Sequence, residues 1–185
     1  HDPVDVERQR VAALRHVRTL TSRPIGFNAI VEQSNRMYLD RMRVWVDIAL
    51  EEGVRFFVTS LGNPRWVVDA VKPFGGIVYH DVTERKWADK GLAAGVDGLI
   101  AVNRRAGGHA GPKDVGELWK ELGGLGVPLI CAGGVGDEQH FVEALRLHRP
   151  HRVVVVQDHH DFLRGVVAEV DVYAIERHVM GQPAV

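Results

Sequence analysis

One histidine lies in a glycine-rich segment directly after a strongly apolar run, and it is the residue best suited to acid-base chemistry. Residues 99–102 are Leu, Ile, Ala and Val, and residues 106–111 read Ala-Gly-Gly-His-Ala-Gly. A short continuous apolar run is typical of a parallel strand covered on both faces. Because ligands of α/β folds bind at the carboxyl ends of such strands, His109 is predicted to act there as a general base. A solvated surface turn is the alternative, and the position after a buried strand favours the first interpretation.

Two further groups of residues could hold a flat, phosphorylated ligand. Gly107 and Gly108 would let a flat molecule approach the main chain closely. Residues 132–134, Ala-Gly-Gly, follow the apolar run 127–132 and precede a predicted helix, so their N–H groups could bind a phosphate. The alternative for residues 132–134 is a turn that needs glycine only for its backbone geometry.

An asparagine amide stands in an otherwise apolar predicted strand. Asn28 is flanked by Ile25, Phe27 and Ile30. An amide in such a strand needs a hydrogen-bond partner, which the nitrogen and oxygen atoms of a ligand ring could provide. A buried structural amide is the alternative.

The elements that position these residues alternate between strands and helices. Strands are predicted to begin near residues 25, 54, 77, 97, 127 and 152. Helices are predicted from Pro3 to Leu20, around residues 39–49 with an end at Gly53, and over residues 64–71, 83–94, 114–122 and 136–147. The N-terminal helix and all four tryptophans, Trp45, Trp66, Trp87 and Trp119, are expected to pack against the sheet. This order predicts an α/β fold with a parallel sheet, either an open doubly wound sheet or a barrel.

Composition narrows the function classes. With 185 residues, 45% of them hydrophobic and 25% charged, the chain is expected to form one domain over residues 1–185. A net charge of −1 gives no electrostatic support for binding nucleic acid, and no segment is apolar enough to span a membrane. Cys131 is the single cysteine, which excludes an internal disulfide and fits a buried residue in a cytoplasmic protein. The ten histidines match no metal motif, so no metal site is predicted.

The motifs carry a resemblance to the nitronate monooxygenase family, also called 2-nitropropane dioxygenase-like, whose members are FMN-dependent (β/α)8 TIM barrels. The resemblance lies in residues 106–111, in Cys-Ala-Gly-Gly-Val-Gly-Asp at 131–137 and in Phe-Phe-Val-Thr-Ser-Leu-Gly at 56–62. It covers about residues 24–147 and leaves 148–185 as a divergent tail. It implies that the six strands are the third to eighth of a barrel whose first two strands are missing. Open sheet edges then favour self-association, for instance as a homo-oligomer.

The resemblance also implies a reaction and a set of site residues. Ala132, Gly133 and Gly134 would bind the FMN phosphate, Gly107 and Gly108 the flavin edge, and Asn28 the isoalloxazine ring. His109 would take a proton from the carbon next to a nitro group, and alkyl nitronates or nitroalkanes would react with dioxygen to give carbonyl compounds and nitrite.

The same resemblance marks departures from the family. His80 and Asp81 are expected on the same rim, where some relatives carry a basic residue near the flavin, and Asp81 is not basic. Residues 156–160, Val-Gln-Asp-His-His, replace the glycine-threonine turn that completes the phosphate site in relatives.

Two other functions fit the same residues. An FMN-dependent enoyl-acyl-carrier-protein reductase or an NADH:quinone reductase would share the barrel and the glycine-histidine loop. A catalytically silent barrel fragment that binds no flavin is the third interpretation, and the two missing strands favour it.

Overall fold

A computed structural model describes residues 3–134, 139 and 153–156 of the chain. Six parallel strands form one sheet in chain order: β1 (Gly26–Ile30), β2 (Phe56–Ser60), β3 (Ile77–Val82), β4 (Gly98–Val102), β5 (Leu129–Ala132) and β6 (Val153–Val156). Each strand pairs in parallel with the next. A doubly wound sheet reverses its strand order at a switch point, and this sheet does not. The predicted strands are confirmed, and their order is that of a (β/α)8 barrel with six of its strands described.

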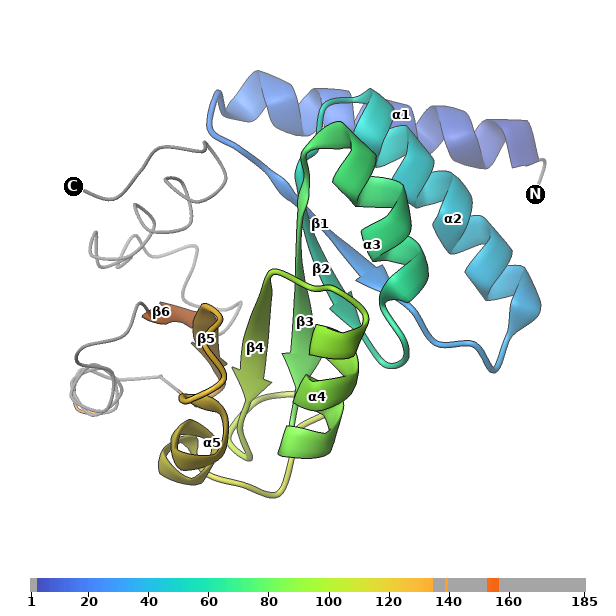
Figure 1. The fold of residues 1–185 in the computed structure, drawn as a ribbon. Coiled ribbons are helices and arrows are strands. Elements are labelled where there is room, and N and C mark those ends of the chain that lie inside the picture. Colours follow the sequence, from blue (N-terminus) through green and yellow to red (C-terminus); the bar gives the residue numbers. More distant parts are fainter. Residues whose placement is uncertain (1–2, 135–138, 140–152, 157–185) are drawn as a thin grey trace.

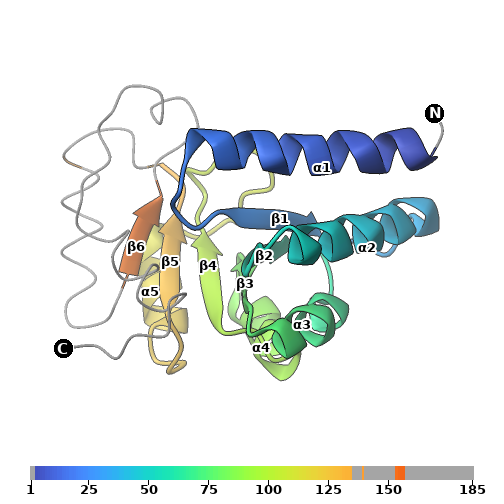
Figure 2. The same cartoon turned by 90° about the horizontal axis from the view of Figure 1, so that it is seen from above.

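The helices connect the strands as predicted. They are α1 (Pro3–Leu20), α2 (Arg36–Glu51), α3 (Arg65–Val71), α4 (Arg85–Ala93) and α5 (Val115–Leu122), with a 3₁₀ turn at Lys72–Phe74. Figure 1 shows the strands following one another across the sheet, and Figure 2 shows that they follow a curve with α2, α3 and α4 outside it. The sheet therefore has an outer face covered by helices and an inner face.

Local residue choices fix where these helices begin. The Asn35 side chain accepts a hydrogen bond from the N–H of Tyr38 at 3.1 Å. Asp114 and Glu117 form the predicted capping box: each side chain accepts a hydrogen bond from the other residue's N–H, at 2.9 and 2.8 Å. A capping side chain satisfies N–H groups that the helix itself leaves unpaired, so both helices begin at defined residues.

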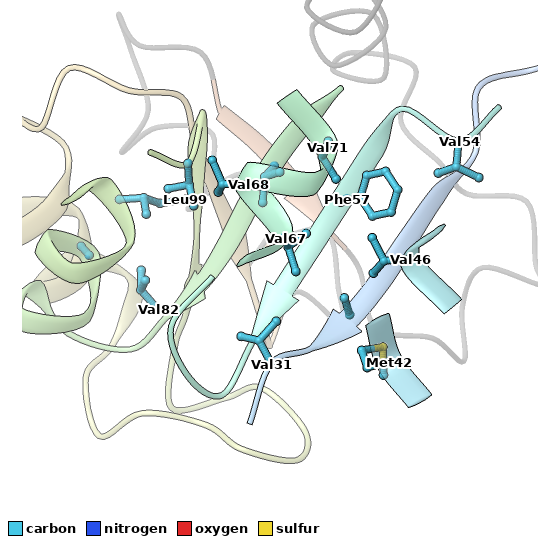
Figure 3. Close-up of a cluster of buried hydrophobic side chains, with 14 of the residues drawn as sticks. Val31, Met42, Val46, Val54, Phe57, Val67, Val68, Val71, Val82 and Leu99 are labelled. Carbon is cyan, nitrogen blue, oxygen red and sulfur yellow. The ribbon is translucent and has the colours of Figure 1, made fainter. Parts of the chain in front are cut away.

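The main core lies between the helices and the outer face of the sheet. Figure 3 shows Phe57 of β2 and Leu99 of β4 in the same layer as Val46 of α2 and Val71 of α3. All four side chains are fully buried. Each such residue contributes about 1.5 to 3 kcal/mol through burial of its apolar surface. This layer holds the strands at fixed register and so sets where their carboxyl ends lie.

The inner face has a smaller apolar cluster of its own. The rings of Phe56 and Tyr79 pack edge to face, with centroids 5.3 Å apart. Gly26 and Gly98 lie beside these rings, and a Cβ on Gly98 would lie 2.5 Å from the Tyr79 ring. Because both glycines are the first residues of their strands, the ring pair lies at the amino-terminal end of the inner face. We call this pair of rings the floor.

Two sequence predictions about helices are wrong. The prediction that α1 packs on the sheet fails, because α1 lies mainly against α2: Arg15 binds the Glu52 carboxylate through Nε and Nη2, and Leu20 is 72% exposed. Trp87, predicted to be a core residue, is 40% exposed on α4 between the ammonium groups of Lys86 and Lys90. An exposed indole beside two cations is stabilised by cation–π attraction and needs no place in the core.

Some predictions concern residues that the structure does not describe. The helix at 136–147, the segment 157–160, the tail up to residue 185 and the C-terminal histidines lie outside the described residues. Within the described part, no helix combines the length and apolar character needed to cross a bilayer.

Candidate functional site

The loop between β4 and α5 carries His109 at the carboxyl end of the sheet. β4 is buried throughout most of its length, as predicted, and the chain leaves it into an exposed segment that includes Gly107, Gly108 and His109. A Cβ on either glycine would meet no described atom within 4 Å, and Gly108 has a φ of +74°. The backbone of this loop is therefore open to a flat ligand, with an imidazole beside it.

The same loop is held firmly at both of its ends. The N–H of Arg104 donates to the carbonyl of Lys113 at 2.8 Å, which ties the start of the loop to its end. At the end of the loop, a Cβ on Gly111 would lie 2.6 Å from Thr83 Cβ, so the loop packs tightly on the segment that follows β3. Only the central part of the loop, around His109, remains open.

Asn103 joins this loop to the turn after β5. Its amide nitrogen donates to the carbonyls of Ala132 and Gly133 at 2.9 and 2.7 Å, and its amide oxygen accepts from the N–H of Arg105 at 2.8 Å. Asn103 is only 3% exposed. Its role was missed in the sequence, although a polar residue directly after a buried strand is a signal that could have indicated it.

The Ala132-Gly133-Gly134 turn needs its glycines because the β4 loop packs against it. A Cβ on Gly133 would lie 2.5 Å from Ala106 Cβ, and one on Gly134 would collide with the Arg105 side chain. Both glycines also have positive φ values, +108° and +71°. These contacts give the turn a structural role. The predicted phosphate-binding role stays a prediction, because the helix expected after the turn lies outside the described residues.

Asn28 lies on the inner face of the sheet, in the middle of its strand. It is the third residue of β1, and its register partner on β2 is Val58. The side chain is exposed rather than buried. This excludes the buried structural amide among the described residues and leaves the amide free to meet a ligand.

The prediction that His80 lies on the rim is wrong, because its side chain faces the helices. It is 3% exposed and lies beside Gly91 of α4, where a Cβ would be 3.1 Å from His80 Cδ2. The Thr59 hydroxyl is 3.1 Å from the carbonyl of Tyr79 and 2.9 Å from His80 Nδ1. Since the hydroxyl has one hydrogen to donate to the carbonyl, Nδ1 carries the hydrogen that bonds Thr59 Oγ1. Burial lowers the pKa of His80 to about 4, so the ring is neutral and structural.

Cys131 is a buried residue, as the sequence predicts. Cys131 is buried on β5, and burial raises the pKa of its thiol to about 12. A thiol in this state is not nucleophilic at neutral pH. The described residues hold no group of three histidine, cysteine, aspartate or glutamate side chains that could bind a metal.

Several features of the described residues fit a flavin. The open backbone at Gly107 and Gly108 leaves room where a Cβ would otherwise stand, and the exposed amide of Asn28 lies on the inner face of the same sheet. Amide and main-chain groups are the donors and acceptors that ring nitrogen and oxygen atoms require. The open loop backbone beside His109 and the amide of Asn28 are therefore groups of the kind that a flat heteroaromatic ring needs.

Many solved structures are similar to this fold, among them a FabK and a nitroalkane oxidase. FabK from Thermotoga maritima is 27% identical, with a TM-score of 0.66 over 84% of this chain and 47% of its own. A nitroalkane oxidase from Streptomyces ansochromogenes is 19% identical, with a TM-score of 0.66 over 76% of this chain and 52% of its own. This chain thus spans about half the length of the solved structures that it matches.

The family comparison covers more of the chain than the motifs alone. The model of the family described as "Nitronate monooxygenase" matches residues 8–147, which include most of α1 as well as β1 to β5. The match ends at the residue where the resemblance in the sequence ends. It includes the His109 loop, Asn28 and the turn at residues 132–134. The chain therefore belongs to the nitronate monooxygenase family.

Proposed function

We propose that this chain provides the flavin-binding and catalytic half of an FMN-dependent oxidoreductase that oxidises nitroalkanes or alkyl nitronates with dioxygen. The observation that carries the proposal is the His109 loop. It lies in the segment matched by the family model, at the carboxyl end of a buried strand, with open backbone on the residues before the histidine. In barrel enzymes this edge of the sheet is where catalytic residues are found.

The residues of the chain have separable roles in this reaction. His109 takes the proton from the carbon next to the nitro group of a neutral substrate, because an imidazole can accept a proton near neutral pH. Gly107 and Gly108 leave space for the flavin edge, Asn28 hydrogen-bonds its ring, and Ala132, Gly133 and Gly134 bind its phosphate. When bound, FMN supplies the capacity to accept electrons from the substrate and pass them to dioxygen.

Asn103 acts indirectly in this proposal. Its amide nitrogen fixes the β4 loop to the turn after β5 through two hydrogen bonds, and its amide oxygen accepts a third from the N–H of Arg105 within the β4 loop. The two segments proposed to hold the two ends of the cofactor are therefore kept at one distance from each other. Such fixed positioning is what a reaction between a bound ring and a substrate proton requires.

A reductase is the second candidate function. Identity to FabK exceeds identity to the nitroalkane oxidase, 27% against 19%, so overall likeness does not single out nitroalkane chemistry. An FMN-dependent enoyl-acyl-carrier-protein reductase or NADH:quinone reductase would use the same loop to accept a cofactor and a planar substrate.

Stopped-flow reduction tests the two functions. The chain is loaded with FMN, freed of oxygen and mixed with ethyl nitronate or with NADH while the visible absorbance of the flavin is followed. We expect rapid bleaching by ethyl nitronate and slow bleaching by NADH. The reverse order would support the reductase, and a chain that takes up no FMN would contradict both.

A further inference from the structure

The Asn103 side chain binds two successive carbonyl groups of the turn that follows β5. Its amide nitrogen donates to the carbonyl oxygens of Ala132 and Gly133, at 2.9 and 2.7 Å. Both hydrogens of the amide group are used in this way, one for each carbonyl. Because Asn103 is only 3% exposed, it holds these two peptide groups from within the fold.

This contact determines where the next two N–H groups point. A peptide group is planar and almost always trans, so its N–H points away from its C=O. The N–H of Gly133 shares a peptide group with the carbonyl of Ala132, and the N–H of Gly134 shares one with the carbonyl of Gly133. Since both carbonyls face Asn103, both N–H groups face the opposite side of the turn.

The two sides of the turn have different neighbours. Asn103 belongs to the β4 loop, which packs so closely on the turn that a Cβ on Gly133 would lie 2.5 Å from Ala106 Cβ. The carbonyls therefore face the β4 side. β5 lies between β4 and β6, so the N–H groups face away from β4 and toward the side of β6. Successive N–H groups on one side of a turn form a concave site that attracts anions.

We propose that Asn103 is the positioning residue of a phosphate site: by binding the carbonyls of Ala132 and Gly133, it aligns the N–H groups of Gly133 and Gly134 on the phosphate of FMN. The proposal rests on the proposed function, which places the phosphate at this turn, and it adds the residue that gives the turn its direction. Without the two donors of Asn103, nothing in the β4 loop holds the partly negative carbonyl oxygens away from the anion. Asn103 thus lets the site distinguish FMN from riboflavin, which has the same ring and no phosphate.

Equilibrium binding of FMN and riboflavin tests this proposal, because the two ligands differ only in the phosphate. Flavin fluorescence gives the dissociation constants of both ligands for wild type, Asn103→Ala and Asn28→Ala, and a melting curve shows that each variant is folded at the temperature used. Asn28→Ala is the matched control, since it removes an amide proposed to meet the ring that both ligands share. The ratio of the two constants reports on the phosphate, whereas a general loss of structure changes both constants together.

We expect wild type to bind FMN more tightly than riboflavin by about tenfold or more. Asn103→Ala should weaken FMN binding about 10- to 100-fold, the usual range for hydrogen bonds to a charged group, and riboflavin binding by about threefold or less. Asn28→Ala should keep the wild-type ratio. Equal losses for both ligands in Asn103→Ala would overturn the proposal and leave Asn103 a purely structural role.

Nuclear magnetic resonance of wild type gives a second readout that depends on no variant. The amide proton signals of Gly133 and Gly134 should move downfield on binding FMN and much less on binding riboflavin, because hydrogen bonds to a charged phosphate are short and strong. Gly124, in the segment between α5 and β5, is the internal control. Equal movements with both flavins would overturn the proposal and leave the proposed flavin function standing. A wild type that binds neither flavin would overturn the proposed function as well.

Discussion

At the scale of single residues, the side chain with the clearest chemical role is His109. It is exposed in a loop whose backbone is open on the preceding glycines and anchored at both ends. Replacing it with asparagine keeps a polar group of similar size and removes the ability to accept a proton. The predicted role of His109 can thus be separated from any part it has in holding the loop.

We predict that His109→Asn leaves FMN binding unchanged and slows turnover of neutral nitroethane by about 10²- to 10⁴-fold, the usual effect of a lost general base. Turnover of ethyl nitronate should fall much less, because this substrate has already lost the proton. Steady-state rates with both substrates measure the difference. Equal rates for wild type and variant on nitroethane would exclude His109 as the base.

His80 gives a prediction about pH and stability. Its pKa is about 4 in the folded chain and near its ordinary 6.5 in the unfolded chain, so the unfolded chain binds more protons between these values. The contribution of His80 to the free energy of unfolding is therefore fully present above pH 6.5. It falls as the pH drops towards 4, by about 3 kcal/mol. Urea unfolding of wild type and His80→Asn at pH 7 and pH 4.5 measures it.

The variant keeps a polar atom near Thr59 Oγ1 but does not titrate, so His80→Asn should lose less stability than wild type on acidification. Asp81 acts in the opposite direction, because its raised pKa makes the folded chain hold its proton between about pH 4 and 6. The effect of His80 is therefore read from the difference between wild type and His80→Asn, and not from the pH dependence of either protein alone. An identical loss in both would show that His80 is already charged or solvent-exposed in the folded chain.

At the scale of elements, two neighbouring loops act as one unit. Asn103 connects them, and Ala106 and Arg105 fill the space above Gly133 and Gly134. A change in either loop should therefore move the other. In these two loops, Gly133 and Gly134 are needed for close packing, whereas Gly107 and Gly108 leave room for a ligand.

We predict that Asn103→Ala lowers the free energy of unfolding by about 2 to 4 kcal/mol, because three buried hydrogen bonds are lost together. Asn63→Ala is the matched control, since the Asn63 side chain makes one exposed hydrogen bond to the N–H of Arg65. The control should lose about 1 kcal/mol or less. Urea unfolding measures both, and a loss in Asn103→Ala no larger than that of the control would contradict the proposed connection between the loops.

A second pair of variants compares open and packed glycines. Gly107→Ala should leave the melting temperature unchanged, because its Cβ would meet no described atom within 4 Å, yet weaken FMN binding about tenfold, or about 1.4 kcal/mol. Gly133→Ala should lower the free energy of unfolding by about 1 to 3 kcal/mol through overpacking against Ala106. Melting curves and FMN titrations of both variants measure this. Unchanged FMN affinity in Gly107→Ala would mean that no ring lies over Gly107.

The sequence predicts strands and helices well here, and single side-chain positions less well. The run at 99–102 is apolar on both faces, which only a buried strand requires, and the capping box at Asp114 and Glu117 fixes a helix start locally. His80 and Asp81 were both expected on the rim, but adjacent strand residues face opposite sides, and the register that decides which side is tertiary. Helical spacing predicts a core position for Trp87. The structure instead places its ring on the helix surface, beneath the ammonium groups of Lys86 and Lys90.

At the scale of the whole molecule, the described sheet has an unpaired edge at β1. β1 hydrogen-bonds to β2 on one side, whereas β4 lies between β3 and β5. Unpaired strand edges expose N–H and C=O groups and promote association with other chains. The edge also carries Asn28, so an association there would affect the proposed flavin site.

We predict that amides from Phe27 to Ile30 exchange hydrogen faster than those from Leu99 to Val102, because half of the hydrogen-bonding groups of β1 face the open edge. Hydrogen exchange at low and high protein concentration measures this. Protection of β1 that rises with concentration would show self-association through the edge. Equal protection of both strands at the lowest concentration would contradict the open edge.

The two rings of the floor limit where a ligand can bind on the inner face of the sheet. Phe56 and Tyr79 fill the amino-terminal end of the inner face, and the glycines beside them, Gly26 and Gly98, leave space that the rings themselves occupy. In the described part of the sheet, a ligand bound on the inner face would therefore lie toward the carboxyl ends of the strands, where the His109 loop is. A larger residue at position 98 would have to displace the Tyr79 ring, because a Cβ there would lie 2.5 Å from it, and so would reshape the inner face without changing a residue of the His109 loop.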